Sequence, residues 1–274
     1  MARTGHVAKP IGIFDSGLGG LTVVRAIAAA FPAENLVYLG DTARVPYGTR
    51  SAKTVVRYAI ACAEHLLSFD IKLLVVACNT VSGVALGELQ GRLQIPVIGV
   101  IQPGGRAGVQ ATRSGRIGVL ATAGTVTSGA YERAIHSENP EMSVFARPAP
   151  LLVPLAEEGW VAGEVPRLAA RRYLQPLVDV DVDTIVLGCT HYPLLSETIH
   201  EVAAELLGHE VAIVDSAEAT AAALTEMLTP DRSSDRPAGS LKILVTDLPG
   251  QFAAAASRFL GRPLDGLDIQ VIDL

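Results

Sequence analysis

The sequence has few cysteines, few aromatic residues and no excess of positive charge. Three cysteines in 274 residues are too few, and odd in number, for a disulfide framework, so we expect free thiols in a reducing compartment. The formal net charge of −6, with no block of Lys or Arg, argues against a nucleic-acid or anionic membrane surface. These features leave a small molecule as the expected partner.

Long apolar runs are also missing. No apolar stretch approaches the roughly 20 residues that span a bilayer, and the N-terminal MARTGHVAKP lacks the features of a signal peptide. We therefore expect a cytoplasmic protein. The hydrophobic content of 49% is ample for the core of one large or two medium domains.

Two stretches of the chain share one pattern. In LLVVACNTVS (73–82) and TIVLGCTHYP (184–193), an apolar, β-branched run leads through a small residue and a cysteine towards a helix-like segment. Such runs predict buried parallel strands, and open α/β sheets place their chemistry at the carboxyl ends of these strands. Cys78 and Cys189 should therefore both lie at strand ends that face a crevice.

The spacing of these stretches indicates a duplicated half. The two cysteines are 111 residues apart, and a second pair of similar strands, GIFDS (12–16) and GVLAT (118–122), is offset by 106 residues. The simplest use of such a duplication is a protein of two domains. Each domain would then present one thiol to a shared cleft.

Strand-like and helix-like segments alternate along nearly the whole chain, which predicts mostly parallel sheets with helices on both faces. We expect an α/β fold of two similar domains with the active site between them. The tract QPGGRAGVQATRSG (102–115) is expected to cross between domains, and EVAIVDS (210–216) resembles IFDS, which suggests a return to the first domain. The predicted first domain contains residues 1–102 and 213–274, and the second contains residues 103–212.

The two matched thiols are the strongest candidates for chemistry. A thiol has an ordinary pKa of about 8.5, which a neighbouring cation or a helix N-terminus lowers, so either cysteine could act as a base. One cysteine alone is as often a small buried hydrophobe, but two in matched positions favour a function. Cys62 lies inside an amphipathic helical pattern, and we interpret it as part of the core.

Charged residues accompany both thiols. His191 follows Cys189 by two residues and could stabilise a thiolate. Asp15 and Asp41 end two early strands, where each is either an acid in the crevice or an ordinary helix cap. Glu157 belongs to a Glu-Glu pair that contains either an active-site acid or two surface residues.

Uncharged polar residues occupy the predicted turns from strand to helix. Hydroxyl groups, amides and free backbone N–H groups at such turns suit a carboxylate ligand, and any one of them alone is an ordinary cap. The residues in question are Ser16, Asn79, Thr80 and Thr190.

Several other chemistries fit parts of the pattern. The stretch GLGG with Asp41 about 20 residues later resembles a dinucleotide fingerprint, but Thr22 stands where the third glycine should be. The two cysteines and His191 could ligate zinc, although a structural zinc site needs four ligands. A cysteine hydrolase leaves the second thiol unexplained, and redox dithiols are usually C-x-x-C pairs.

A series of motifs between about residue 10 and residue 220 limits these alternatives. The motifs are IGIFDSGLGGLTV, GDTARVPYGTRS, VVACNTVS, IPVIGVI, IGVLATAGTVTSGAY, LVPLAEEG, IVLGCTHYPLL and VDSAEATA. Together they resemble glutamate racemases, of the cofactor-independent aspartate/glutamate racemase group. The resemblance implies interconversion of L- and D-glutamate without a cofactor or metal, which supplies D-glutamate for peptidoglycan.

The same resemblance implies roles for individual residues. The thiol of Cys78 would act on the D isomer and that of Cys189 on the L isomer, with Asp15 and His191 assisting them and Asp41 and Glu157 as further catalytic candidates. The residues expected around the substrate are Asp15, Ser16, Tyr47, Gly48, Asn79, Thr80, Thr190 and His191.

We expect glutamate as the ligand and a homodimer as the assembly. An aspartate racemase of the same group and a glutamate-binding protein without catalysis are the remaining alternatives.

Overall fold

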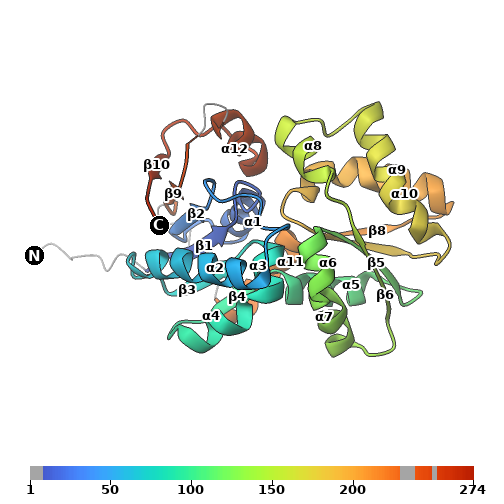
Figure 1. Ribbon diagram of the computed structural model, residues 1–274, viewed down its shortest axis with the longest axis horizontal. Helices are drawn as coiled ribbons and strands as arrows, with labels where there is room; N and C mark the ends of the chain where they lie inside the picture. Colours follow the sequence, from blue (N-terminus) through green and yellow to red (C-terminus); the bar gives the residue numbers. More distant parts are fainter. Residues whose placement is uncertain (1–8, 229–237, 249–251) are drawn as a thin grey trace, which may run out of the picture.

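Two separate parallel sheets organise the chain in the computed structural model, which describes residues 9–228, 238–248 and 252–274. The N-terminal MARTGHVA lies outside the described residues. Figure 1 shows the two sheets side by side, each with its own helices. The expected α/β fold class, with mostly parallel sheets flanked by helices, is confirmed.

The first sheet contains the strands from the two ends of the chain. Its order is β10-β9-β2-β1-β3-β4, and all the pairings are parallel. The strands are β1 (Ile11–Asp15), β2 (Leu36–Gly40), β3 (Leu73–Val76), β4 (Val97–Gly99), β9 (Leu241–Val245) and β10 (Asp268–Val271). Its helices are α1 (Leu21–Ala30), α2 (Ala52–Leu67), α3 (Asn79–Val84), α4 (Leu86–Arg92), α11 (Ser216–Met227) and α12 (Phe252–Leu260).

The second sheet is built from the middle of the chain. Its order is β6-β5-β7-β8, again all parallel. The strands are β5 (Arg116–Ala121), β6 (Ser143–Pro148), β7 (Thr184–Gly188) and β8 (Ala212–Asp215). The helical segments are α5 (Ile101–Ala111), α6 (Ala123–Ser128), α7 (Ala130–Glu138), α8 (Leu152–Glu158), α9 (Glu164–Val178), η1 (Tyr192–Leu195) and α10 (Ser196–Leu207).

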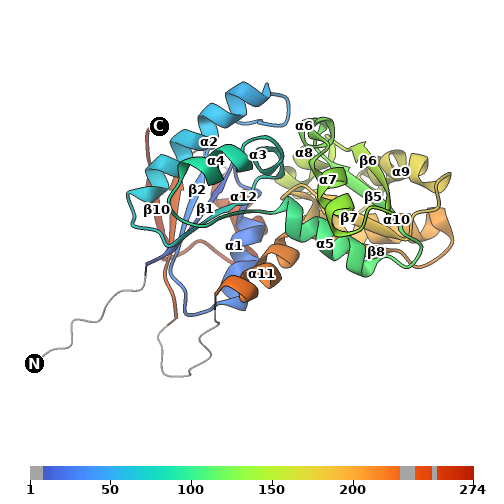
Figure 2. The same ribbon diagram turned by 90° about the horizontal axis from the view of Figure 1, so that it is seen from below.

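Helices cover both faces of the first sheet. Figure 2 shows α2 and α4 on one side and α1 and α11 on the other. Every residue of β1, β2 and β3 is consequently buried, which explains why these strands are apolar except for Asp15 at the end of β1. One apolar core cluster extends through both units, from Ile13 in β1 to Ile185 in β7. Among the described helices, none is both long and apolar enough to cross a membrane.

The strand orders place a switch point in each sheet. In the first sheet β1 lies between β2 and β3, and in the second β5 lies between β6 and β7. In open parallel sheets the crevice at such a point, beyond the carboxyl ends of the strands, is where ligands bind. The segments that follow β1, β3, β5 and β7 therefore frame the expected site.

The expected position of the strand at 210–216 is wrong. Strand β8 pairs with β7 in the second sheet, so the predicted boundary at residue 213 falls inside a strand of that sheet. The sequence likeness to β1 was misleading because both are apolar runs followed by Asp-Ser, a local pattern that does not specify which sheet a strand joins. The chain leaves the second sheet only with α11, which packs against α1 and α5.

The tract 102–115 runs from β4 of the first sheet to β5 of the second, as expected for a crossing between the units. Most of the tract is helix α5, which packs on β7 and α7, because a proline is compatible with the first turn of a helix. The stretch TVTSGAYERAIHS, which follows β5, contains two helices, α6 and α7. They separate at Gly129, whose φ of 62° is left-handed and ends the first helix.

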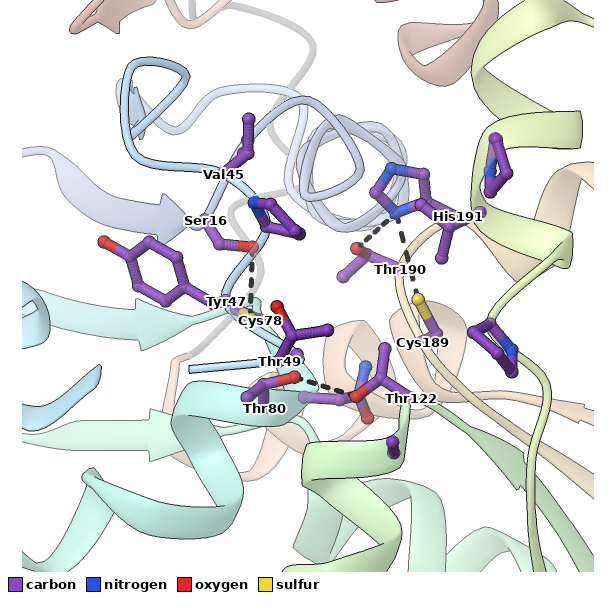
Figure 3. A pocket seen from close by; sticks show the side chains of 18 of the residues that line it. Ser16, Val45, Tyr47, Thr49, Cys78, Thr80, Thr122, Cys189, Thr190 and His191 are labelled. Carbon is purple, nitrogen blue, oxygen red and sulfur yellow. Dashed lines mark hydrogen bonds between the residues drawn. The ribbon is translucent and has the colours of Figure 1, made fainter. Parts of the chain in front are cut away.

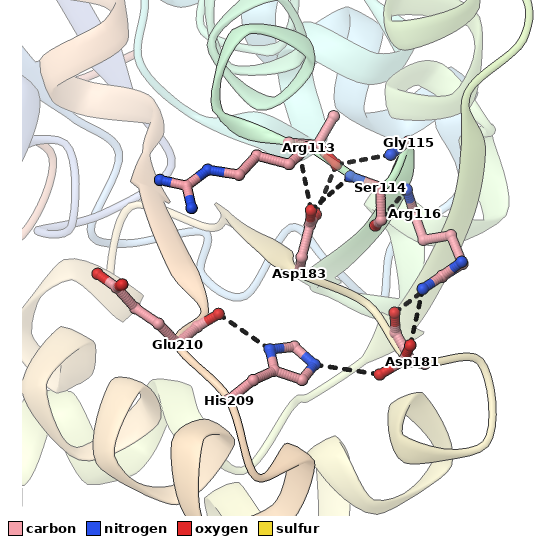
Figure 4. A network of polar contacts seen from close by, with 9 residues as sticks. Arg113, Ser114, Gly115, Arg116, Asp181, Asp183, His209 and Glu210 are labelled. Atoms are coloured by element: carbon pink, nitrogen blue, oxygen red, sulfur yellow. Dashed lines mark hydrogen bonds and ion pairs between the residues drawn. The ribbon is translucent and has the colours of Figure 1, made fainter.

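Asp183, just before β7, ties that strand to the turn between α5 and β5 (Figure 4). Its carboxylate accepts hydrogen bonds from Thr112 Oγ1 at 2.5 Å and from the backbone N–H groups of Arg113 and Ser114 at 2.7 and 2.6 Å. Burial raises the pKa of Asp183, but these hydrogen bonds, the one from Thr112 first, outweigh burial and lower the pKa to about 2.

We expect Asp183→Asn to lower the melting temperature at pH 7 by about 2–4 °C. In a chain of this size that shift corresponds to a loss of about 1 kcal/mol in the free energy of unfolding, a discounted value because Asp183 is only partly buried. A carboxylate with a lowered pKa stabilises the fold above its unfolded pKa and ceases to do so as pH falls through its folded pKa. The difference from wild type should therefore shrink between about pH 4 and pH 2, as thermal unfolding followed by circular dichroism would show.

Asp181→Asn is the matched control for this prediction. Asp181 lies in the same region and forms exposed ion pairs with Arg116 and His209 at 2.7 and 3.1 Å (Figure 4). Exposed pairs contribute little, so the control should change the melting temperature by about 1 °C or less. Equal melting temperatures of Asp183→Asn and wild type at pH 7 would contradict the role given to Asp183.

Candidate active site

A cavity of about 400 Å³ lies between the two units, at the carboxyl ends of the switch-point strands. We call it the central cavity. Its volume lies in the usual range for a small-molecule site. It is lined by Ser16, Gly17, Val45, Pro46, Tyr47, Gly48, Thr49, Cys78, Asn79, Thr80, Thr122, Ala123, Pro150, Val153, Pro154, Glu157, Cys189, Thr190 and His191.

Cys78 and Cys189 reach the central cavity from different sheets. Cys78 follows β3 and caps the N-terminus of α3, and Cys189 directly follows β7. Figure 3 shows the two side chains on opposite sides of the cavity. Both thiols are free, and each residue is about 5% exposed, so the sulfur atoms are largely shielded from water.

An acid accompanies Cys78. The thiol donates a hydrogen bond to Ser16 Oγ at 3.4 Å. Asp15 is fully buried behind the cavity wall, where one carboxylate oxygen accepts the Gly17 N–H at 3.0 Å. Burial first, and the negative charge of Asp15 second, raise the pKa of Cys78 to about 12. Cys78 is therefore a thiol at neutral pH.

Asp15 itself has an unusual environment. Its second carboxylate oxygen has no hydrogen-bond partner among the residues that the structure describes. Burial raises the pKa of Asp15, while the charge of His191 and three backbone N–H groups oppose that shift. Asp15 does not line the central cavity, so it acts on the site through the field it creates rather than by contact.

A histidine accompanies Cys189. The sulfur lies 3.8 Å from His191 Nδ1, and His191 Nε2 lies 3.1 Å from a carboxylate oxygen of Glu157 (Figure 3 shows the sulfur contact). Burial lowers the pKa of His191, but the bonds and charges of Cys189 and Glu157 outweigh it and raise the pKa to about 10. The imidazole is therefore a cation at neutral pH, placed to stabilise a thiolate at Cys189.

Helix α12 supports this histidine from outside the cavity. The ring of Phe259 meets that of His191 edge-on, with centroids 4.9 Å apart and an interplanar angle of 72°. Arg258 donates a hydrogen bond to the backbone oxygen of Glu157. Sequence reasoning missed these contacts because the segment after about residue 230 carries no motif.

Polar groups lie between the two thiols. The hydroxyl groups of Thr80 and Thr122 are 3.0 Å apart, and both are within 3.3 Å of the Thr125 hydroxyl, so this threonine cluster joins the two units. The Asn79 amide nitrogen has no partner within the described part of the chain, although the side chain is buried. Thr190 Oγ1 lies 3.4 Å from His191 Nδ1.

Of the remaining predicted residues, some line the central cavity and others lie behind its wall. Tyr47 and Gly48 line the central cavity. Asp41 does not, because its carboxylate accepts hydrogen bonds from the hydroxyl groups of Tyr47 and Thr246 and from Arg44. Asp41 therefore supports the Tyr47 wall from behind. Cys62 is fully buried in α2, as the core interpretation predicted.

Several lining residues were missing from the sequence-based list. They are Gly17, Val45, Pro46, Thr49, Thr122, Ala123, Pro150, Val153 and Pro154. Thr122 had a usable signal, since the offset that aligns GIFDS with GVLAT pairs it with Ser16. The others lie in loops or, for Ala123, Val153 and Pro154, in the first turns of α6 and α8, and their approach to the cavity depends on the packing of the two units.

The GLGG turn brings the two units together. A Cβ atom at Gly19 would lie 2.3 Å from Thr190 Oγ1 and 2.4 Å from His191 Nδ1, so only glycine allows this approach. The space over the turn, where a dinucleotide fingerprint would hold a pyrophosphate, is filled by the Cys189 segment. Within the described residues, no group of three or more His, Cys, Asp or Glu side chains is arranged to hold a metal ion.

Comparison with known proteins identifies similar chains. The sequence model described as Asp/Glu/Hydantoin racemase matches residues 11–224. The chain is 53% identical over 259 residues to the glutamate racemase of Geobacter metallireducens, covering 93% of this chain and 94% of that one. The crystal structure of a glutamate racemase from Bacillus anthracis superposes with a TM-score of 0.87 at 38% identity, covering 98% of this chain and 99% of that one. The glutamate racemase of Francisella tularensis in complex with D-glutamate superposes with a TM-score of 0.86 at 34% identity, covering 97% of each chain.

The environment of His191 can be tested by titration. We expect NMR to show its imidazole titrating near pH 10, far above the ordinary 6.5. Glu157→Gln should lower that pKa, because a neutral amide no longer stabilises the imidazolium. Glu158→Gln, which changes the neighbouring glutamate outside the cavity lining, is the matched control and should leave the pKa unchanged. Titration near 6.5 in the wild-type protein would refute this account.

Proposed function

Because the chain belongs to the Asp/Glu/hydantoin racemase family, we propose that it interconverts L- and D-glutamate with the thiols of Cys78 and Cys189. The chain is thus an enzyme of the isomerase class. The observation that carries the two-thiol proposal is the presence of two free thiols, from separate sheets, in one cavity of about 400 Å³. The substrate assignment rests on the high identity to proteins named glutamate racemase.

The reaction needs one base and one acid on opposite faces of Cα. With L-glutamate, the Cys189 thiolate takes the Cα proton, and the carbanion formed takes the proton of the Cys78 thiol on its other face. The two sulfur atoms then have exchanged protonation states, and D-glutamate reacts by the reverse path. The His191 cation favours a thiolate at Cys189, and the Asp15 charge favours a thiol at Cys78.

Two thiols do not account for the whole rate. One positioned acid or base contributes about 10²- to 10⁴-fold, which leaves much of the barrier to breaking a C–H bond beside a carboxylate. The rest is supplied by hydrogen-bond donors that stabilise the charge on the carboxylate of the carbanion. The Asn79 amide and the Thr80, Thr122 and Thr190 hydroxyls line the cavity for that purpose. Ser16, Tyr47 and Gly48 complete the binding site, and the two units act as domains that close on the ligand.

The cellular role follows from the proposed product. We propose that the D-glutamate enters peptidoglycan synthesis and that the chain acts in the cytoplasm as a homodimer. Deletion in the source organism should then create a requirement for D-glutamate, and sedimentation equilibrium should give twice the chain mass of 28.6 kDa. Growth without D-glutamate, or a monomer at micromolar concentration, would remove the corresponding part of the proposal.

Replacement of either active-site thiol is the direct test. Cys78→Ser and Cys189→Ser should each lower kcat/KM by at least about 10³-fold. A serine hydroxyl does not replace a cysteine thiolate as a base, so each variant loses one positioned acid–base group. The two enantiomers have equal free energy in solution, so the loss must be the same in both directions. Cys62→Ala, which removes the third thiol, should keep kcat/KM within about threefold. Normal turnover in either serine variant would rule out the two-thiol mechanism.

Isotope exchange distinguishes a two-thiol enzyme from a binding protein. In deuterated water, deuterium should appear at Cα of the product enantiomer, while the remaining substrate stays unlabelled at low conversion, because a different thiol delivers the new proton. One-base chemistry would return the original proton, and a binding protein would exchange none. Parallel assays with aspartate decide between the two amino acids; faster turnover of aspartate would overturn the substrate assignment.

A further inference from the structure

Tyr131, in the first turn of α7, lies where the segments of the two cysteines meet. Its hydroxyl donates a hydrogen bond to the Asn79 side-chain oxygen at 2.7 Å, and Asn79 directly follows Cys78. Its ring packs on Gly188, which directly precedes Cys189; a Cβ atom there would come within 2.8 Å of the ring. One side chain of the second unit thus contacts the neighbour of each thiol.

The hydrogen bond determines which way the Asn79 amide points. Asn79 is 1% exposed and lines the central cavity, and its oxygen is already bonded to Tyr131. The amide nitrogen is left without a partner among the described residues. A buried donor without a partner destabilises the fold unless a ligand supplies the acceptor. A carboxylate, which only accepts hydrogen bonds, is a suitable ligand for that donor.

The opposite amide orientation would suit the ligand badly. With its oxygen towards the cavity, Asn79 would present a second acceptor to a carboxylate, and the two would repel each other. Burial raises the pKa of Tyr131, so its hydroxyl keeps its proton throughout the working range. With that proton donated to the Asn79 oxygen, the hydroxyl favours the amide orientation whose N–H groups point away from Tyr131.

We propose that Tyr131 is a positioning residue that fixes the Asn79 amide with its N–H groups towards a carboxylate of the substrate. The inference rests on the proposed function and extends it, since Tyr131 itself does not line the cavity. The same bond links the two units, so the orientation of the binding amide depends on how the units sit against each other.

Tyr131→Phe is the first test, because it removes the hydroxyl and keeps the ring on Gly188. One neutral hydrogen bond corresponds to a factor of about 2 to 12, so we expect kcat/KM to fall about five- to tenfold. The loss should appear mainly in KM, because Asn79 contacts the bound substrate before and during the reaction. A KM within twofold of wild type would overturn the proposal.

Thr198→Val is the matched control for the loss of a buried hydroxyl. Thr198 is buried in α10, outside the cavity lining, and its hydroxyl donates one bond of the same length, 2.7 Å, to the Val161 backbone oxygen. Both variants should lower the melting temperature by a similar amount, but only Tyr131→Phe should raise KM. A residue that merely fills the core would behave like the control.

A double-mutant cycle shows whether Tyr131 acts through Asn79. Added to Asn79→Ala, the Tyr131→Phe change should cost less than about twofold, because the group it orients is already absent. An undiminished loss in that background would show that Tyr131 acts by another route and would overturn the proposal.

Two further measurements separate this inference from the proposed function. The affinity for D-glutamate, measured by calorimetry, should be five- to tenfold lower in Tyr131→Phe than in the wild-type protein. This result is expected even if the wild-type protein binds glutamate without racemising it. An unchanged affinity would overturn the inference about Tyr131 and leave the proposed function untouched. If Tyr131→Phe does not fold, a crystal structure of the wild-type protein with D-glutamate decides. The proposal is supported if the Tyr131 hydroxyl still donates to the Asn79 oxygen and the Asn79 amide nitrogen donates to a carboxylate of the ligand. A flipped Asn79 amide, or a broken Tyr131–Asn79 hydrogen bond, would overturn it.

Discussion

The contact between the strand-end segments of two sheets is the constraint on which the rest of the structure depends. Short hydrogen bonds cross from one unit to the other around the central cavity. Thr22 Oγ1 donates to the Thr190 backbone oxygen at 3.0 Å, and the Gly124 N–H donates to the Gly48 oxygen at 3.0 Å. Because each unit supplies only one of the two thiols that line the cavity, neither unit alone contains the site proposed above. The packing of the two units therefore decides whether that site is formed.

The two thiols occupy similar positions in the fold and opposite electrostatic environments. Burial and the nearby charge of Asp15 raise the pKa of Cys78. Cys189 instead has His191 beside it, whose pKa is raised to about 10 by Cys189 and Glu157. The proposed division into one proton donor and one proton acceptor rests on this difference. The asymmetry lies in the neighbours Asp15 and His191 and not in the strands, which are equivalent.

Polar groups without partners are concentrated around the same cavity. Among the described residues, the buried side-chain atoms with no hydrogen bond belong to Asp15, Arg44 and Asn79. Such atoms are rare in folded proteins because each costs about 1–3 kcal/mol. All three lie beside or behind the wall of the central cavity. Their cost in folding stability is therefore concentrated at the proposed binding site. Tyr131 holds the Asn79 side chain and Asp41 holds that of Arg44, each through a hydrogen bond.

The sequence by itself determined the strands, the fold class, the family and the two thiols. Apolar β-branched runs, the turn residues that end them and motifs such as GCTHYP are local properties, and the family prediction is confirmed. The placement of β8 was wrong because an apolar run before Asp-Ser is a local pattern that occurs in both sheets. The contacts of Tyr131, Phe259 and Arg258 could not be predicted either. Each joins residues more than 50 positions apart, and such contacts arise only when helices and sheets pack into one particular arrangement.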